Sequence, residues 1–143
     1  MKTILATLLF LLVIVSTNCQ HTVSPESSDT VDQNYTTDLN QGRKWFEGKW
    51  KLTTVSAMIP SPTVPDVQLI VNKNQITLIQ DGKQTDQVSF EIIQTPYDFQ
   101  LKTNSQYQNG YLGNSGLRIS RNRLFIDKGM ANDFPGFEFK RME

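Results

Sequence analysis

The stretch Tyr97-Asp98-Phe99-Gln100-Leu101-Lys102 alternates apolar and polar side chains without a break. Successive side chains of a β-strand point to opposite faces of a sheet, so a period of two is typical of a strand with one buried face. Tyr97, Phe99 and Leu101 are therefore predicted to face a core, and the polar residues between them to face solvent. The stretch indicates an all-β domain.

The same period of two recurs in segments on both sides, from Gly48 to Arg141. The dipeptide Asp81-Gly82 between two such segments predicts a hairpin, because both residues tolerate the positive φ that a two-residue turn requires. Residues 43–47 alone have a pattern that suits a helical turn. The inward-facing aromatic side chains that the alternation predicts are Trp50, Phe90, Tyr97, Phe99, Phe137 and Phe139.

About eight short strands are predicted between residues 43 and 143, joined mostly by turns of hairpin length. Eight meandering antiparallel strands favour a closed barrel, which has no unpaired edge, and an open sandwich is the alternative. A barrel of this size is just wide enough to be filled by its own side chains or to hold one small ligand. The many inward aromatics slightly favour the filled interior, and the aromatic set is also the candidate ligand-binding surface.

Charge argues against a nucleic-acid-binding protein. The chain has 143 residues, with 14 basic and 14 acidic side chains. From Arg43 onward there are 13 basic and 10 acidic side chains, a net charge of +3. This excess is too small and too scattered for the dense basic face that binds nucleic acid.

The N-terminus has the pattern of a signal peptide over residues 1–19. Lys2 gives a positive start, and residues 4–15 form an apolar run that is too short for a membrane span, which needs roughly 20 apolar residues. Cys19, the chain's one cysteine, follows this run and resembles the processing site of bacterial lipoproteins. The resemblance implies acylation of Cys19 and attachment to the bacterial cell envelope through a lipid anchor only. Ser16 and Asn18 depart from the usual pattern, so a soluble secreted protein is the alternative.

Residues 20–42 are predicted to be a disordered polar linker, because they are rich in Ser, Thr, Asp, Asn and Gln and poor in apolar residues. The one histidine, His21, lies in this linker, which argues against His-based catalysis and against a His-ligated metal site in the domain. The loop 127–133 carries several oxygen ligands, but Lys128 lies among them and the spacing does not match a calcium loop. The chain is expected to be neither an enzyme nor a cofactor-binding protein.

The residues Phe46-Glu47-Gly48-Lys49-Trp50-Lys51-Leu52 resemble the opening of the lipocalin and fatty-acid-binding superfamily, with its Gly-x-Trp at the first strand. The closing segment 124–141 resembles small lipocalin-like lipoproteins of Bacteroidetes-type bacteria. The resemblance covers residues 44–143 and implies a lipocalin-like barrel. It also implies a late basic side chain across Trp50, for which Arg141 is the first candidate and Arg123 the second.

Two functions from different classes follow. The first is a carrier or sensor that binds a small apolar molecule inside the barrel. The second is a filled barrel that presents loops to an envelope protein, as an accessory subunit or an inhibitor. The mouth is expected near Tyr107, Tyr111, Met58 and Met130, and the loop aromatics that a protein partner would contact are Tyr107, Tyr111 and Phe134.

Overall fold

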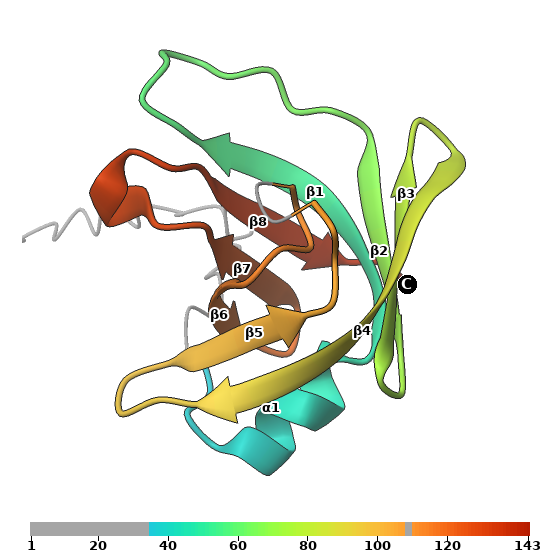
Figure 1. Cartoon of the computed structure of the whole chain (residues 1–143), viewed down its shortest axis with the longest axis vertical. Helices are drawn as coiled ribbons and strands as arrows, with labels where there is room; N and C mark the ends of the chain where they lie inside the picture. Colours follow the sequence, from blue (N-terminus) through green and yellow to red (C-terminus); the bar gives the residue numbers. More distant parts are fainter. Residues whose placement is uncertain (1–34, 108–109) are drawn as a thin grey trace, which may run out of the picture.

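The computed structural model describes residues 35–107 and 110–143. Within these residues, eight strands form a closed antiparallel barrel in which each strand pairs with its neighbours in sequence and β1 pairs with β8 (Figure 1). The predicted all-β meander is therefore confirmed. The predicted signal peptide with Cys19, the histidine and residues 20–34 of the linker lie outside the described part. The strands are β1 (Gly48–Ser56), β2 (Val67–Asn72), β3 (Gln75–Gln80), β4 (Lys83–Gln94), β5 (Phe99–Thr103), β6 (Ser115–Ile119), β7 (Arg123–Asp127) and β8 (Gly136–Arg141), with two short helices, α1 (Leu39–Phe46) and η1 (Met130–Asn132).

Hairpin turns and two irregularities shape the sheet. Asp81 and Gly82 join β3 to β4 with φ values of 51° and 74°, as a two-residue turn requires. The β1–β8 ladder shifts register between Leu52 and Thr54. The β3–β4 ladder shifts after Leu78, which leaves Thr85 between two consecutive pairs. Such bulges bend a strand and increase its twist, which helps a sheet to close.

Helix α1 begins at Leu39, four residues earlier than the predicted helical turn and inside the predicted linker. The Asp38 side chain caps the helix, since its Oδ1 accepts a hydrogen bond from the Gln41 backbone N–H at 2.7 Å. Just before the cap, the Thr36 backbone N–H donates to the Ile119 carbonyl at the end of β6 (2.9 Å). The predicted domain boundary at residue 43 is therefore wrong, because the folded domain includes residues 35–42.

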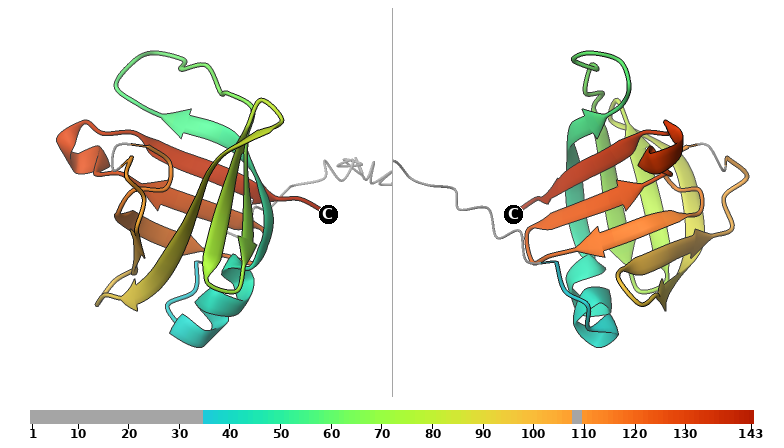
Figure 2. Two further views of the ribbon diagram at one scale, coloured as in Figure 1. Left: turned by 45° about the vertical axis from the view of Figure 1, so that its right-hand side comes forward. Right: turned by 90° about the vertical axis from the view of Figure 1, so that its left-hand side faces the viewer.

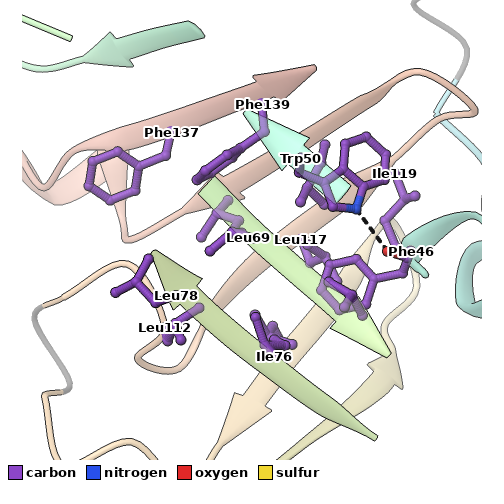
Figure 3. Close-up of a cluster of buried hydrophobic side chains, with 14 of the residues drawn as sticks. Phe46, Trp50, Leu69, Ile76, Leu78, Leu112, Leu117, Ile119, Phe137 and Phe139 are labelled. Atoms are coloured by element: carbon purple, nitrogen blue, oxygen red, sulfur yellow. Dashed lines mark hydrogen bonds between the residues drawn. The ribbon is translucent and has the colours of Figure 1, made fainter. Parts of the chain in front are cut away.

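The core fills the barrel from the α1 end. Figure 2 shows α1 lying across one end of the barrel. Phe46 from α1 is fully buried, and its ring packs edge-on against Phe90 with centroids 5.1 Å apart. The Trp50 indole N–H donates to the Phe46 carbonyl at 2.8 Å (Figure 3). This end of the barrel is thereby closed by aromatic side chains.

The prediction that Tyr97 faces inward is wrong, since its side chain is 86% exposed. The strand β5 begins only at Phe99. Tyr97 lies in a tight turn in which the Thr95 hydroxyl donates to the Asp98 carbonyl (2.8 Å) and accepts from the Asp98 backbone N–H (3.0 Å). The turn removes Tyr97 from the alternation that its sequence neighbours follow.

Candidate functional site

The end of the barrel away from α1 opens onto a cavity. At this end β3 and β4 meet in the Asp81–Gly82 turn, whereas Phe90, farther along β4, packs against α1. A cavity of about 750 Å³, open to solvent, lies between the β3–β4 hairpin and the loop that joins β5 to β6. We call it the mouth cavity. Its volume falls within the roughly 300–1,000 Å³ that is usual for small-molecule sites.

The floor of the mouth cavity is apolar. Leu78 and Leu112 line it, and both are buried members of the core, with Leu112 only 1% exposed. Figure 3 shows Leu78, Leu112 and Phe137 at one end of the core and Phe46 and Trp50 at the other. The floor therefore lies between the cavity and the buried core.

The β5–β6 loop forms one wall. The Thr103 hydroxyl donates to the Leu112 carbonyl, and the Tyr107 backbone N–H donates to the Ser105 hydroxyl at 3.1 Å. Tyr111 is half-buried, and its ring meets Phe137 of β8 with centroids 4.7 Å apart. These contacts bring the loop aromatics over the end of the barrel.

Polar groups line the opposite wall, on the β3–β4 hairpin. Gln80, Thr85 and Asp86 face the cavity from this hairpin. The Asp86 carboxylate accepts a hydrogen bond from the hydroxyl of Ser105 in the β5–β6 loop at 3.1 Å, which joins the two walls at this point. Burial and, to a smaller extent, the charge of Asp81 raise the pKa of Tyr111 above its ordinary value, so its hydroxyl stays protonated at neutral pH.

The predicted interior residues do not line the mouth cavity. Trp50, Phe99 and Phe139 are buried in the core, and Phe137 is buried against Tyr111. Phe90 is half-buried against α1, and Tyr97 is on the surface. The predicted mouth residues Tyr107 and Tyr111 do line the cavity, whereas Met58 and Met130 belong to a different hollow.

That second hollow, of about 510 Å³, lies between the β1–β2 connection and η1. Met58 and Ile59 on one side are 77% and 67% exposed, and Phe134 on the other is 53% exposed. We call it the apolar groove. It contains the third aromatic, Phe134, that the sequence suggests as a contact for a protein partner.

Sequence reasoning missed Asp86 and Ser105, although Asp86 could have been found. It lies on the same face of β4 as the buried Val88 and Ile92, directly opposite Leu78 of β3. The sequence signal is an acidic residue at a position of the alternation where the other residues are apolar and predicted to face inward. Ser105 lies in a loop, where no periodicity indicates its orientation.

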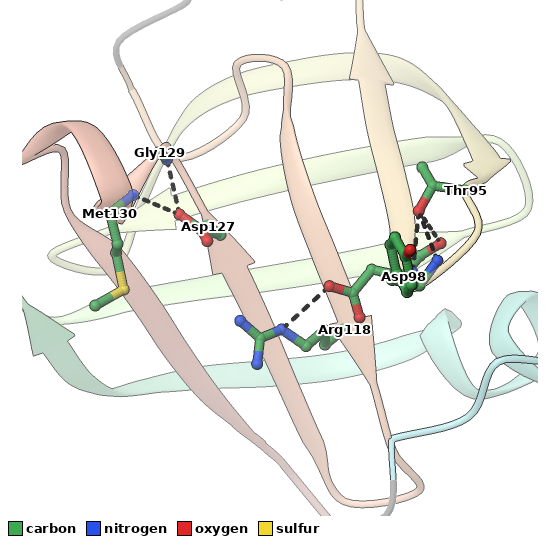
Figure 4. A network of polar contacts seen from close by, with 7 residues as sticks. Thr95, Asp98, Arg118, Asp127, Gly129 and Met130 are labelled. Carbon is green, nitrogen blue, oxygen red and sulfur yellow. Dashed lines mark hydrogen bonds and ion pairs between the residues drawn. The ribbon is translucent and has the colours of Figure 1, made fainter.

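The loop 127–133 is an ordinary turn. The Asp127 carboxylate accepts hydrogen bonds from the backbone N–H groups of Gly129 (2.7 Å) and Met130 (2.8 Å), as Figure 4 shows. Oδ1 accepts both bonds and is thus directed at the backbone that starts η1. Among residues 35–107 and 110–143, no three His, Cys, Asp or Glu side chains are placed to hold a metal ion.

Arg141 lies across Trp50. Its Cζ is 4.2 Å from the centre of the Trp50 ring. Its Nε donates to the Arg121 carbonyl at 2.7 Å, its Nη1 to the Glu47 carbonyl at 2.8 Å, and its Nη2 to the Trp45 carbonyl. This is the arrangement that the resemblance to lipocalins implies, whereas Arg123 pairs with Glu138 (3.2 Å).

No family model, curated protein or solved structure matches this chain. The structure shows an eight-stranded antiparallel barrel, which is compatible with a lipocalin-like fold. In the part of the chain that the structure describes, no helix is long and apolar enough to cross a bilayer.

Proposed function

We propose that this chain is an exported lipocalin-like protein that binds a small, largely apolar molecule in the mouth cavity. The observation that carries the proposal is the shape of the barrel, which is filled and closed at the α1 end and hollow at the other. The cavity has an apolar floor, aromatic side chains on one wall and a few polar groups on the other, as small-molecule sites commonly do.

The proposed place of action is the bacterial cell envelope, where a lipid on Cys19 would hold the domain at a membrane. The segment 4–15 followed by Cys19 supports this part of the proposal. No catalytic role is proposed: the Ser105 hydroxyl on the cavity wall is hydrogen-bonded to Asp86, but none of the described lining residues is a His, Cys or Lys that could complete a nucleophilic site.

The test uses the full chain and the neutral fluorescent probe N-phenyl-1-naphthylamine. We expect saturable binding at one site, weakened at least about tenfold by Thr85→Trp, which places a large side chain in the cavity opening. Phe134→Ala in the apolar groove is the control and should leave binding unchanged. Urea unfolding of each variant checks that the fold is intact.

A second function is favoured by the apolar groove. Exposed Met58, Ile59 and Phe134 gather at one place, and clustered exposed apolar side chains often mark a contact with another protein. The probe experiment separates the two functions. Absence of saturable binding, or loss of binding in Phe134→Ala with no change in Thr85→Trp, contradicts the carrier function and favours the interaction module.

A further inference from the structure

The mouth cavity contains a carboxylate that the barrel directs inward. Asp86 pairs with Leu78 in the β3–β4 ladder and shares its face of β4 with the buried Val88. Its side chain is half-buried and lines the cavity. Acidic side chains are rarely placed toward the interior of a domain unless they are paired, so this position calls for a partner.

Within the described residues, Asp86 has neutral hydrogen-bond donors as partners and forms no ion pair. Asp86 accepts hydrogen bonds from the Ser105 hydroxyl (3.1 Å) and from the Gln87 backbone N–H (2.8 Å). The three ion pairs within the described residues involve other carboxylates, those of Asp66, Asp98 and Glu138. None of the described residues that line the cavity is Lys, Arg or His.

A second carboxylate, that of Asp81, lies near the cavity, in the same hairpin as Lys83, which pairs with the lining residue Gln80. Asp81 lies in the turn at the rim, and its charge reaches the Tyr111 hydroxyl, where it adds to the effect of burial in raising the pKa of Tyr111. Tyr111 itself lines the cavity. A bound molecule would therefore meet an apolar floor below and negative charge at the side.

We infer that the mouth cavity takes a cationic amphiphile, a molecule with an apolar body on Leu78 and Leu112 and an amine head at Asp86. This inference rests on the proposed function and names its ligand class. The carboxylate head of a fatty acid would lie against the Asp86 carboxylate, and none of the described lining residues is a cation that could offset the charge. Because like charges at close range repel, such a head group is disfavoured. The cavity thus selects against fatty acids.

The experiment compares three probes with the same chain and different heads: dodecylamine, 1-dodecanol and dodecanoate. Each is titrated, below its aggregation limit and near neutral pH, against the full chain loaded with N-phenyl-1-naphthylamine. We expect dodecylamine to displace the dye at a concentration at least about tenfold lower than dodecanoate, the factor that corresponds to about 1.4 kcal/mol. Dodecanol should lie between them, and added salt should narrow the difference.

Two variants assign the head-group preference to Asp86. Asp86→Asn keeps the shape and an acceptor for the Ser105 hydroxyl, and it should bring dodecylamine and dodecanoate to within about threefold of each other. Asp133→Asn is the matched control, because it removes the same charge at an exposed residue beside the apolar groove. Asp133 has a φ of 65°, which asparagine tolerates, and the control should keep the preference of the wild type.

The outcomes are distinct. If none of the three probes displaces the dye, and the dye itself does not bind saturably, both the inference and the proposed function fail. If dodecanoate binds as tightly as dodecylamine, the cavity binds ligands but the inferred class is wrong. If dodecylamine is preferred equally by the wild type and by Asp86→Asn, the charge of Asp86 does not select the head group and the inference is overturned. The wild-type comparison decides the ligand class even if Asp86→Asn does not fold.

Discussion

At the scale of single residues, Gly48 shows why a short motif can mark the start of this barrel. Its φ is 131°, a conformation that side-chain-bearing residues rarely adopt. A Cβ at this position would overlap Nη1 of Arg141, which passes over Gly48 to reach the Glu47 carbonyl. The glycine, Trp50 and Arg141 are therefore parts of one arrangement, in which the guanidinium needs both the ring beside it and the absence of a side chain at residue 48.

This arrangement predicts that Gly48→Ala lowers the free energy of unfolding by about 2–4 kcal/mol, from backbone strain and from loss of the Arg141 hydrogen bonds. Gly82→Ala is the matched control, because Gly82 has a φ of 74° but an added Cβ would meet open space, with no atom beyond its chain neighbours within 4 Å. It should cost about 1 kcal/mol, the strain alone. Urea unfolding measures both, and equal losses would contradict the role assigned to Arg141.

Residues also show how far the sequence predicts the site. Alternation correctly predicted burial of Trp50, Phe99 and Phe139, because a period of two holds wherever a strand is regular. It failed for Tyr97, where the Thr95–Asp98 turn interrupts the period. The polar wall of the cavity was not predicted, because it depends on a loop residue, Ser105, meeting a strand residue 19 positions away.

At the scale of elements, α1 is a structural part of the barrel and not a connection to it. It is only 8 residues long, a length at which an isolated helix is marginal in water. It is held by the Asp38 cap at its start and by the burial of Phe46 at its end. Gly42 lies directly against Phe99, since a Cβ there would be 2.9 Å from the ring, so the helix approaches β5 very closely.

Asp38→Ala should therefore lower the free energy of unfolding of the whole domain by about 1 kcal/mol, because the cap holds a helix that contributes to the core. Asp38→Asn keeps a capping oxygen and is expected to stay within about 0.5 kcal/mol of the wild type. The urea midpoint at constant m-value gives the comparison. Equal losses in the two variants would mean that the carboxylate charge, and not the cap, stabilises α1.

The predicted start of the domain was wrong because residues 35–42 look like a linker in sequence but belong to the fold. Residues 35–42 contain few apolar side chains, so composition alone suggested a linker. Their place in the fold depends on single hydrogen bonds, from the Thr36 backbone N–H to Ile119 and from the Gln41 backbone N–H to Asp38. Such bonds leave little trace in composition, although Asp38 before an amphipathic turn is a recognised start signal.

At the scale of the whole molecule, the closed barrel was predictable because regular alternation and hairpin turns follow one another with few exceptions. Whether the barrel interior is filled or hollow was less predictable from the sequence. Whether a barrel of eight strands has a cavity depends on how its loops fold over the ends, and here the β5–β6 loop inserts Leu112 into the core while leaving the mouth cavity beside it. Local periodicity does not indicate where a loop will pack against strands that are distant in sequence.

The whole molecule should be attached to a membrane if Cys19 is acylated. We expect the N-terminal peptide of the mature protein to begin at Cys19 and to have an added acyl mass, measured by mass spectrometry after detergent extraction. Cys19→Ser should move the protein to the soluble fraction, because several acyl chains, at about 0.8 kcal/mol per buried methylene, supply the membrane affinity. An unmodified peptide would support the soluble secreted alternative.

The pairing of β1 with β8 has a consequence for biosynthesis. The first strand ends at Ser56 and its partner ends at Arg141, 85 residues later. At a synthesis rate of roughly 5–20 residues per second, β1 exists for about 4–17 s before its second neighbour is made. During this interval no early fragment can acquire a finished sheet, and one edge of β1 stays free to pair with other chains. A nascent chain with this topology cannot close its barrel until β8 has been made.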